Sequence, residues 1–85
     1  MGNERMYDLY LEQLREAMVA DENAAAALRG GKVEQAIQLY NQAASLYARA
    51  AQSLMDAGEG CDAQEYLEIE KSVDRLISIS RELRE

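Results

Sequence analysis

The sequence predicts an all-α fold, a single domain over residues 1–85 in which three helices form an antiparallel bundle. The chain has no proline and is rich in alanine, leucine, glutamate, glutamine and arginine, all of which favour helices. No window alternates apolar and polar residues for long enough to indicate a β-strand. Apart from Gly2, the glycines fall at two places only, Gly30-Gly31 and Gly58-Glu59-Gly60. Because glycine is the residue that most often ends a helix, these two places divide the chain into three helices.

The first helix is predicted over residues 4–29. Its apolar residues recur at intervals of three and four, as they do on one face of a helix. They are Tyr7, Tyr10, Leu11, Leu14, Ala17, Met18, Ala25 and Leu28.

The second helix is predicted over residues 32–57, and its apolar arc is unusually wide. One stripe has the same spacing of three and four, and Leu39, Leu46, Ala50 and Met55 widen it beyond a single face. The main stripe consists of Val33, Ala36, Ile37, Tyr40, Ala43, Ala44, Tyr47, Ala51 and Leu54. Such an arc predicts that the second helix lies between the other two.

The third helix is predicted over residues 62–84. Asp62 is an acceptable N-cap, and Glu65 three residues later completes an arrangement like a capping box. The apolar stripe comprises Tyr66, Ile69, Val73, Leu76, Ser80 and Leu83, whereas Leu67, Ile77 and Ile79 lie off it. The connections between helices are only two to five residues long, so neighbouring helices must run antiparallel.

Composition and charge exclude several classes of function. Sixteen acidic against nine basic residues give a net charge of −7, which opposes nucleic-acid binding and favours basic partners. Histidine is absent, which removes the commonest general base and metal ligand. The single cysteine, Cys61, has no histidine to activate it and cannot form an internal disulfide. We therefore expect no catalytic residues, no metal site and no cofactor, and no segment that inserts directly into a membrane.

A recurring pattern of residues crosses the first glycine break. Gly31 is followed by an acid at Glu34, alanine at Ala36, an aromatic at Tyr40 and alanine at Ala43. The glycine ends the first helix, and the acid is favoured in the first turn of the second helix. The two alanines allow the helices to approach closely, and Tyr40 fills the space between them.

This spacing resembles the helical hairpin of tetratricopeptide repeats and, more closely, that of MIT (microtubule-interacting and trafficking) domains. Only one copy is present, whereas a tetratricopeptide array needs several. The rest of the chain supplies one long third helix, as in the MIT bundle, and Val73-Asp74-Arg75 is similar to a step in that family's third helix. The order and lengths of the predicted helices look most like those of the spastin and spartin branch of MIT domains.

The resemblance implies a protein-interaction module that takes part in membrane trafficking. MIT domains bind short helical or extended segments, such as the basic tails of ESCRT-III proteins, in grooves between their helices. A groove between the second and third helices would use apolar residues and two acids for a basic ligand. These candidates are Tyr47, Ala50, Ala51 and Leu54, then Val73, Leu76 and Ile77, with the acids Glu70 and Asp74.

Other interpretations remain open at this stage. A groove between the first and third helices would instead use Leu11, Leu14 and Met18 with Ile69 or Ile79. The module could also serve a structural or oligomerisation role, or act as a secretion-type chaperone without any ESCRT link. We expect a monomer or weak homo-oligomer in the cytoplasm, cut from a longer polypeptide and associated with endosomal membranes only through its partners.

Overall fold

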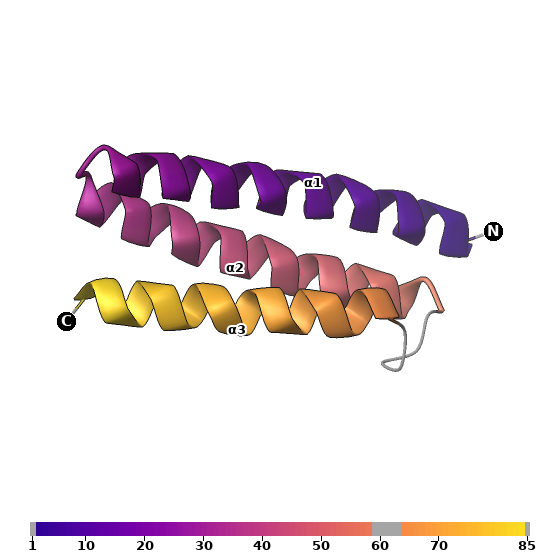
Figure 1. The fold of residues 1–85 in the computed structure, drawn as a ribbon. Coiled ribbons are helices and arrows are strands. Elements are labelled where there is room, and N and C mark those ends of the chain that lie inside the picture. Colours follow the sequence, from indigo (N-terminus) through magenta and orange to yellow (C-terminus); the bar gives the residue numbers. More distant parts are fainter. Residues whose placement is uncertain (1, 59–63, 85) are drawn as a thin grey trace.

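The computed structural model describes residues 2–58 and 64–84 of the chain, which form three α-helices and, in these residues, no strand. The helices are α1 (Gly2–Arg29), α2 (Val33–Asp56) and α3 (Gln64–Arg84), and they pack together as an antiparallel bundle (Figure 1). The predicted all-α three-helix fold is therefore confirmed. The predicted N-cap Asp62 and the cysteine Cys61 lie outside the described residues.

Glycine shapes both helix ends at which the chain turns. At the end of α1, Gly31 has a φ of 78°, and the backbone N–H groups of Gly31 and Lys32 donate to the carbonyl oxygens of Leu28 and Ala27, at 3.0 and 2.9 Å. These two bonds form a Schellman motif, which satisfies carbonyls that a helix end would otherwise leave unpaired. At the end of α2, Gly58 has a φ of 95° and donates to the Met55 carbonyl oxygen at 3.0 Å.

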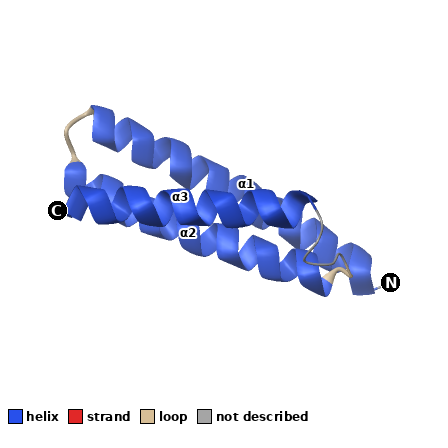
Figure 2. Cartoon of the chain, turned by 60° about the horizontal axis from the view of Figure 1, so that its bottom comes forward, coloured by secondary structure: helices blue, strands red, loops and turns tan. Residues whose placement is uncertain are grey.

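The α2 helix is the centre of the molecule, as its wide apolar arc predicts. It packs against both α1 and α3, more extensively against α1. Among the described residues, no Cα atom of α1 lies within 8 Å of a Cα atom of α3. Figure 2 brings α3 to the front of the bundle, whose dimensions are 46 × 20 × 14 Å. The outer helices are therefore held through α2 rather than through each other's backbones.

Small residues make up much of the core. Alanines of α1 and α2 are buried in the core, and helices approach more closely where the side chains between them are small. These buried alanines are Ala17, Ala20, Ala24, Ala36, Ala43, Ala44 and Ala50. The larger core residues are Tyr10, Tyr40, Tyr47, Leu54, Ile69 and Leu76.

Two buried serines connect the helices through side-chain hydrogen bonds. The Ser53 hydroxyl of α2 donates to the Gln13 Oε1 atom of α1 at 2.7 Å. The Ser80 hydroxyl of α3 donates to the Asn41 Oδ1 atom of α2 at 2.9 Å. Because a buried hydroxyl without a partner costs free energy, these pairs favour one lengthwise register of the helices over others.

Candidate functional site

A groove runs between α2 and α3, and its walls are mostly apolar. From α2 it is lined by Ala48 and Ala51, and α3 contributes Tyr66, Ile69, Glu70, Val73 and Asp74. The α3 residues recur at intervals of three and four, so a single face of that helix forms one wall. The other wall is formed by α2, and it is shallow because its alanine side chains are short. We call this surface the α2/α3 groove.

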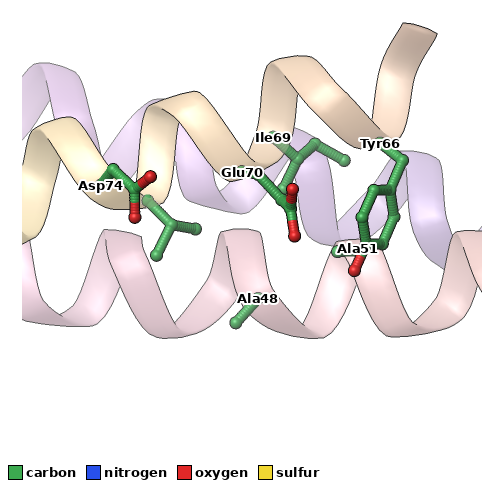
Figure 3. A pocket seen from close by; sticks show the side chains of 7 residues that line it. Ala48, Ala51, Tyr66, Ile69, Glu70 and Asp74 are labelled. Atoms are coloured by element: carbon green, nitrogen blue, oxygen red, sulfur yellow. The ribbon is translucent and has the colours of Figure 1, made fainter. Parts of the chain in front are cut away.

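The two acids of the α2/α3 groove are Glu70 and Asp74, one helical turn apart. Both side chains are exposed, and among the described residues neither has a hydrogen-bond or ion-pair partner. Figure 3 shows both carboxylates on the α3 side of the groove, with Ala48 and Ala51 on the α2 side. Like charges four residues apart on a helix repel each other weakly. A cationic ligand group placed beside them would remove that repulsion.

Four of the residues predicted for the groove line it: Ala51, Glu70, Val73 and Asp74. A fifth, Ile77, lies outside the lining but follows Val73 by four residues, so it continues the same helix face by one turn. Its side chain is 43% exposed. The surface that a ligand could contact therefore extends along α3 beyond the lining itself.

The other four predicted residues lie in the core and not on the groove floor. Ala50, Leu54 and Leu76 are fully buried, and Tyr47 is 6% exposed. The expectation that they form the floor needs correction because α2 is covered on two sides and because Leu76 of α3 is buried in the core. On α2, Tyr47, Ala50 and Leu54 lie in the middle of the apolar arc and are buried in the core.

Three lining residues were not among those predicted for this groove: Ala48, Tyr66 and Ile69. Tyr66 and Ile69 precede Glu70 and Val73 by four residues, so helical spacing from the two predicted residues could have identified them. Ala48 also precedes Ala51 by three residues, but this stretch of α2 contains several alanines, and the sequence alone does not indicate which of them lines a groove.

A second groove lies between α1 and α3, with Tyr47 of α2 beneath it. Three residues predicted for this alternative groove line it together, Leu14, Met18 and Ile69. The remaining lining residues are Tyr10, Tyr47, Glu65, Glu68 and Ser72. Of the other two candidates, Leu11 is exposed and Ile79 is half-buried against the core, and neither is part of the lining. We call this surface the α1/α3 groove.

In the part of the chain that the structure describes, one ion pair joins α1 to α3. The Arg75 Nη2 atom lies 2.8 Å from the Asp21 Oδ2 atom, and the Arg75 side chain is 55% exposed. Exposed pairs of this kind contribute little to stability, about 0–1 kcal/mol. The pair therefore orients the two outer helices without fixing them firmly.

Two tyrosines beneath the α1/α3 groove have altered acidity. Burial raises the pKa of Tyr10 above its ordinary value, and the neighbouring negative charge of Glu65 raises it further. Burial also raises the pKa of Tyr47, with Asp21 adding to the shift and Arg75 opposing it. In both cases desolvation disfavours the phenolate, so each hydroxyl keeps its proton at neutral pH.

The chemistry that these grooves offer is set by the side chains that line them. Within residues 2–58 and 64–84, no three acidic, cysteine or histidine side chains gather in a way that could hold a metal ion. None of the described helices is sufficiently long and apolar to cross a membrane. What the α2/α3 groove offers is apolar surface beside two exposed carboxylates.

Fold and grooves together define an all-α three-helix bundle with concave surfaces between its helices. Comparison of the chain with family models, with curated proteins and with solved structures finds no match. Function must therefore be inferred from the helices, their grooves and their charges.

Proposed function

We propose that this bundle is a non-catalytic, MIT-like interaction module that docks a short basic amphipathic segment of a partner protein in the α2/α3 groove. The observation that carries the proposal is the pairing of an apolar groove with two carboxylates, Glu70 and Asp74, that have no partner among the described residues. The segment would be a basic tail of the ESCRT-III type. The module would act in trafficking or remodelling and would reach endosomal membranes through such partners.

The charge of the chain supports a basic ligand. With a net charge of −7, the molecule attracts cationic segments over a distance and repels acidic ones. At the groove itself, a ligand lysine or arginine could pair with Glu70 or Asp74. Such pairs at the rim of an interface contribute mainly to association rate and specificity.

The apolar part of the groove supports an amphipathic ligand. A helix laid along α3 would place its leucines against the half-buried Val73 and the exposed Ile77, which recur at helical spacing. A ligand of about 15 residues would extend about 22 Å as a helix, comparable with most of the length of α3. Affinity would come from burial of these aliphatic side chains, and orientation from the acids.

Titration calorimetry with a synthetic peptide tests the proposal. The peptide should be basic, of about 15 residues, with leucines at helical spacing, and a panel of ESCRT-III tails should be tested beside it. Charge reversal by Asp74→Lys should weaken binding by about tenfold or more, equivalent to about 1.4 kcal/mol. Ile77→Asp should weaken binding similarly, and because Ile77 is exposed the variant should still fold.

Glu68→Lys provides the matched control because it changes the net charge equally but lies at the α1/α3 groove. It should leave the dissociation constant within about twofold if the ligand occupies the α2/α3 groove. If Glu68→Lys lost peptide binding while Asp74→Lys retained it, the result would indicate that the peptide binds in the α1/α3 groove instead. Absence of any backbone amide shift in NMR spectra with the whole peptide panel would refute the proposed function.

A further inference from the structure

The face of α3 that borders the α2/α3 groove continues to the C-terminal end of the helix and changes its charge on the way. Two acids come first along the chain, an aliphatic residue follows, and two bases come last. Successive residues of an α-helix are turned by about 100°, so all five side chains lie within an arc of about 80°. They are exposed, and we call them the bipolar stripe: Glu70, Asp74, Ile77, Arg81 and Arg84.

The α2 helix accompanies the bipolar stripe beyond the lining of the groove. The Ser80 hydroxyl donates to the Asn41 Oδ1 atom of α2 at 2.9 Å, and Leu83 packs against the core. Figure 1 shows α3 beside α2 as far as the C-terminal end of α3. A ligand that lies between the two helices can therefore reach the last turn of α3.

The charges of the bipolar stripe are available to a ligand. Among the described residues, Arg81 and Arg84 have no hydrogen-bond or ion-pair partner, and the same holds for Glu70 and Asp74. Residues 35–55 of α2, which face this part of α3, include no acid. The two arginines therefore lack a carboxylate on the opposite side of the junction.

The helix dipole does not account for where the two arginines lie. Bases are favoured in the last turn of a helix because they complement its dipole, whichever side of the helix they occupy. Glu82 lies in the same turn but is turned by about 100° from Arg81, away from the stripe. The bases of this turn thus share the face that borders the groove, and its acid does not.

The length of the bipolar stripe matches one short ligand helix. Glu70 and Arg84 are 14 residues apart, which corresponds to about 21 Å along α3. A helix of about 15 residues has nearly the same length, so a single ligand can contact the acids and the arginines at once.

We propose that Arg81 and Arg84 are specificity residues of the α2/α3 groove and select a ligand of mixed charge, an inference that rests on the docking function proposed above. The ligand helix places basic side chains beside Glu70 and Asp74. Its acidic side chains lie beside the two arginines, and an aliphatic residue between them contacts Ile77. The ligand keeps more bases than acids, as the net charge of −7 favours.

This arrangement selects against two kinds of competitor. A uniformly basic segment places like charges beside the arginines, which weakens its binding. A mixed-charge segment laid in the opposite direction places like charges together at both ends of the stripe. The charges therefore fix the direction of the ligand as well as its composition.

Two peptides of about 18 residues test the proposal by titration calorimetry. The bipolar peptide has two glutamates in its first turns, leucines at helical spacing and a larger number of bases in its last turns. The comparison peptide has glutamine in place of both glutamates. The wild-type chain should bind the bipolar peptide about fivefold or more tightly than the comparison peptide. Net charge alone predicts the opposite order, because a chain of −7 attracts the more basic peptide more strongly.

Variants of the chain assign this preference to the arginines. Arg81→Gln should reduce the preference by about twofold or more, and the double variant with Arg84→Gln should abolish it. Lys71→Gln is the matched control, because Lys71 is an exposed base of α3 that is turned by about 100° from Glu70, off the stripe. It should leave the preference unchanged, and circular dichroism should show the same helix content in all variants.

The outcomes separate this inference from the docking function. If the wild-type chain bound both peptides equally, or the comparison peptide more tightly, the selection by charge would be refuted while docking itself would stand. A preference that survived in the double variant, or that Lys71→Gln reduced as much as Arg81→Gln, would overturn the assignment to Arg81 and Arg84. Absence of binding by both peptides would count against the docking function as well.

Discussion

Tyr40 belongs to the motif that joins the first two helices, and only 5% of its surface is exposed. Replacing a large buried side chain with alanine removes apolar contacts and leaves a cavity that the surroundings fill only in part. We expect Tyr40→Ala to lower the free energy of unfolding by about 3–5 kcal/mol, which is enough to unfold so small a domain. Chemical denaturation followed by circular dichroism measures this change.

Leu67→Ala is the control for Tyr40→Ala. Leu67 is 43% exposed, and its replacement should change the unfolding free energy by no more than about 0.5 kcal/mol. If the Tyr40→Ala variant had the same free energy of unfolding as the Leu67→Ala variant, the packing of Tyr40 between the first two helices would not contribute to stability as proposed.

The sequence could identify some, but not all, of the residues that line the α2/α3 groove. Glu70 and Asp74 are acids one turn apart, and their spacing alone places them on one face of a helix. Leu54 and Leu76 have the same helical spacing as groove residues, yet both are fully buried. Periodicity identifies which residues share a face, but whether a neighbouring helix covers that face depends on how the three helices are placed.

At the scale of the elements, the link between α1 and α2 depends on one left-handed residue. Gly31 has a φ of 78°, where a residue with a Cβ atom is strained. We expect Gly31→Ala to lower the free energy of unfolding by about 1 kcal/mol. Urea titration of the variant and the wild type measures the difference.

The adjacent glycine provides the comparison. Gly30 has no positive φ, and a Cβ atom added there would lie 3.6 Å from the carbonyl oxygens of Ala26 and Ala27, an ordinary contact. Gly30→Ala should therefore be neutral or stabilising, by up to about 1 kcal/mol, because it restricts the unfolded chain. Equal destabilisation by both variants would contradict the assignment of Gly31 as the turning residue.

The elements themselves could be predicted well, for identifiable reasons. The glycine pairs fix where the helices stop, and the first two observed helices end within one residue of the predicted 4–29 and 32–57. The wide apolar arc of α2 predicts its central position. The distance between α1 and α3 could not be predicted, because it depends on the sizes of side chains on three helices at once.

For the whole molecule, the two tyrosines with raised pKa predict how stability changes with pH. In the unfolded chain a tyrosine ionises near its ordinary pKa of 10.0, whereas folded Tyr10 and Tyr47 keep their protons to higher pH. Above about pH 10 the native state therefore binds more protons than the unfolded state, and stability falls as pH rises. Below that pH both states are protonated and these groups have no effect.

Denaturation at about pH 8 and about pH 11 measures this loss of stability. Tyr47→Phe removes one ionising group, so the variant should lose less stability between the two pH values than the wild type. An equal or larger loss in Tyr47→Phe would show that the raised pKa of Tyr47 does not contribute.

The unequal packing of α2 against its two neighbours has a mechanical consequence. Since α1 holds α2 more extensively than α3 does, and α3 touches α1 only through side chains, α3 is the part that can swing away at the lowest free-energy cost. The hairpin would survive such an opening. A segment docked between α2 and α3 would contact both helices across this less extensive interface. A bound partner would therefore stabilise the packing of α3, the helix that is held least extensively.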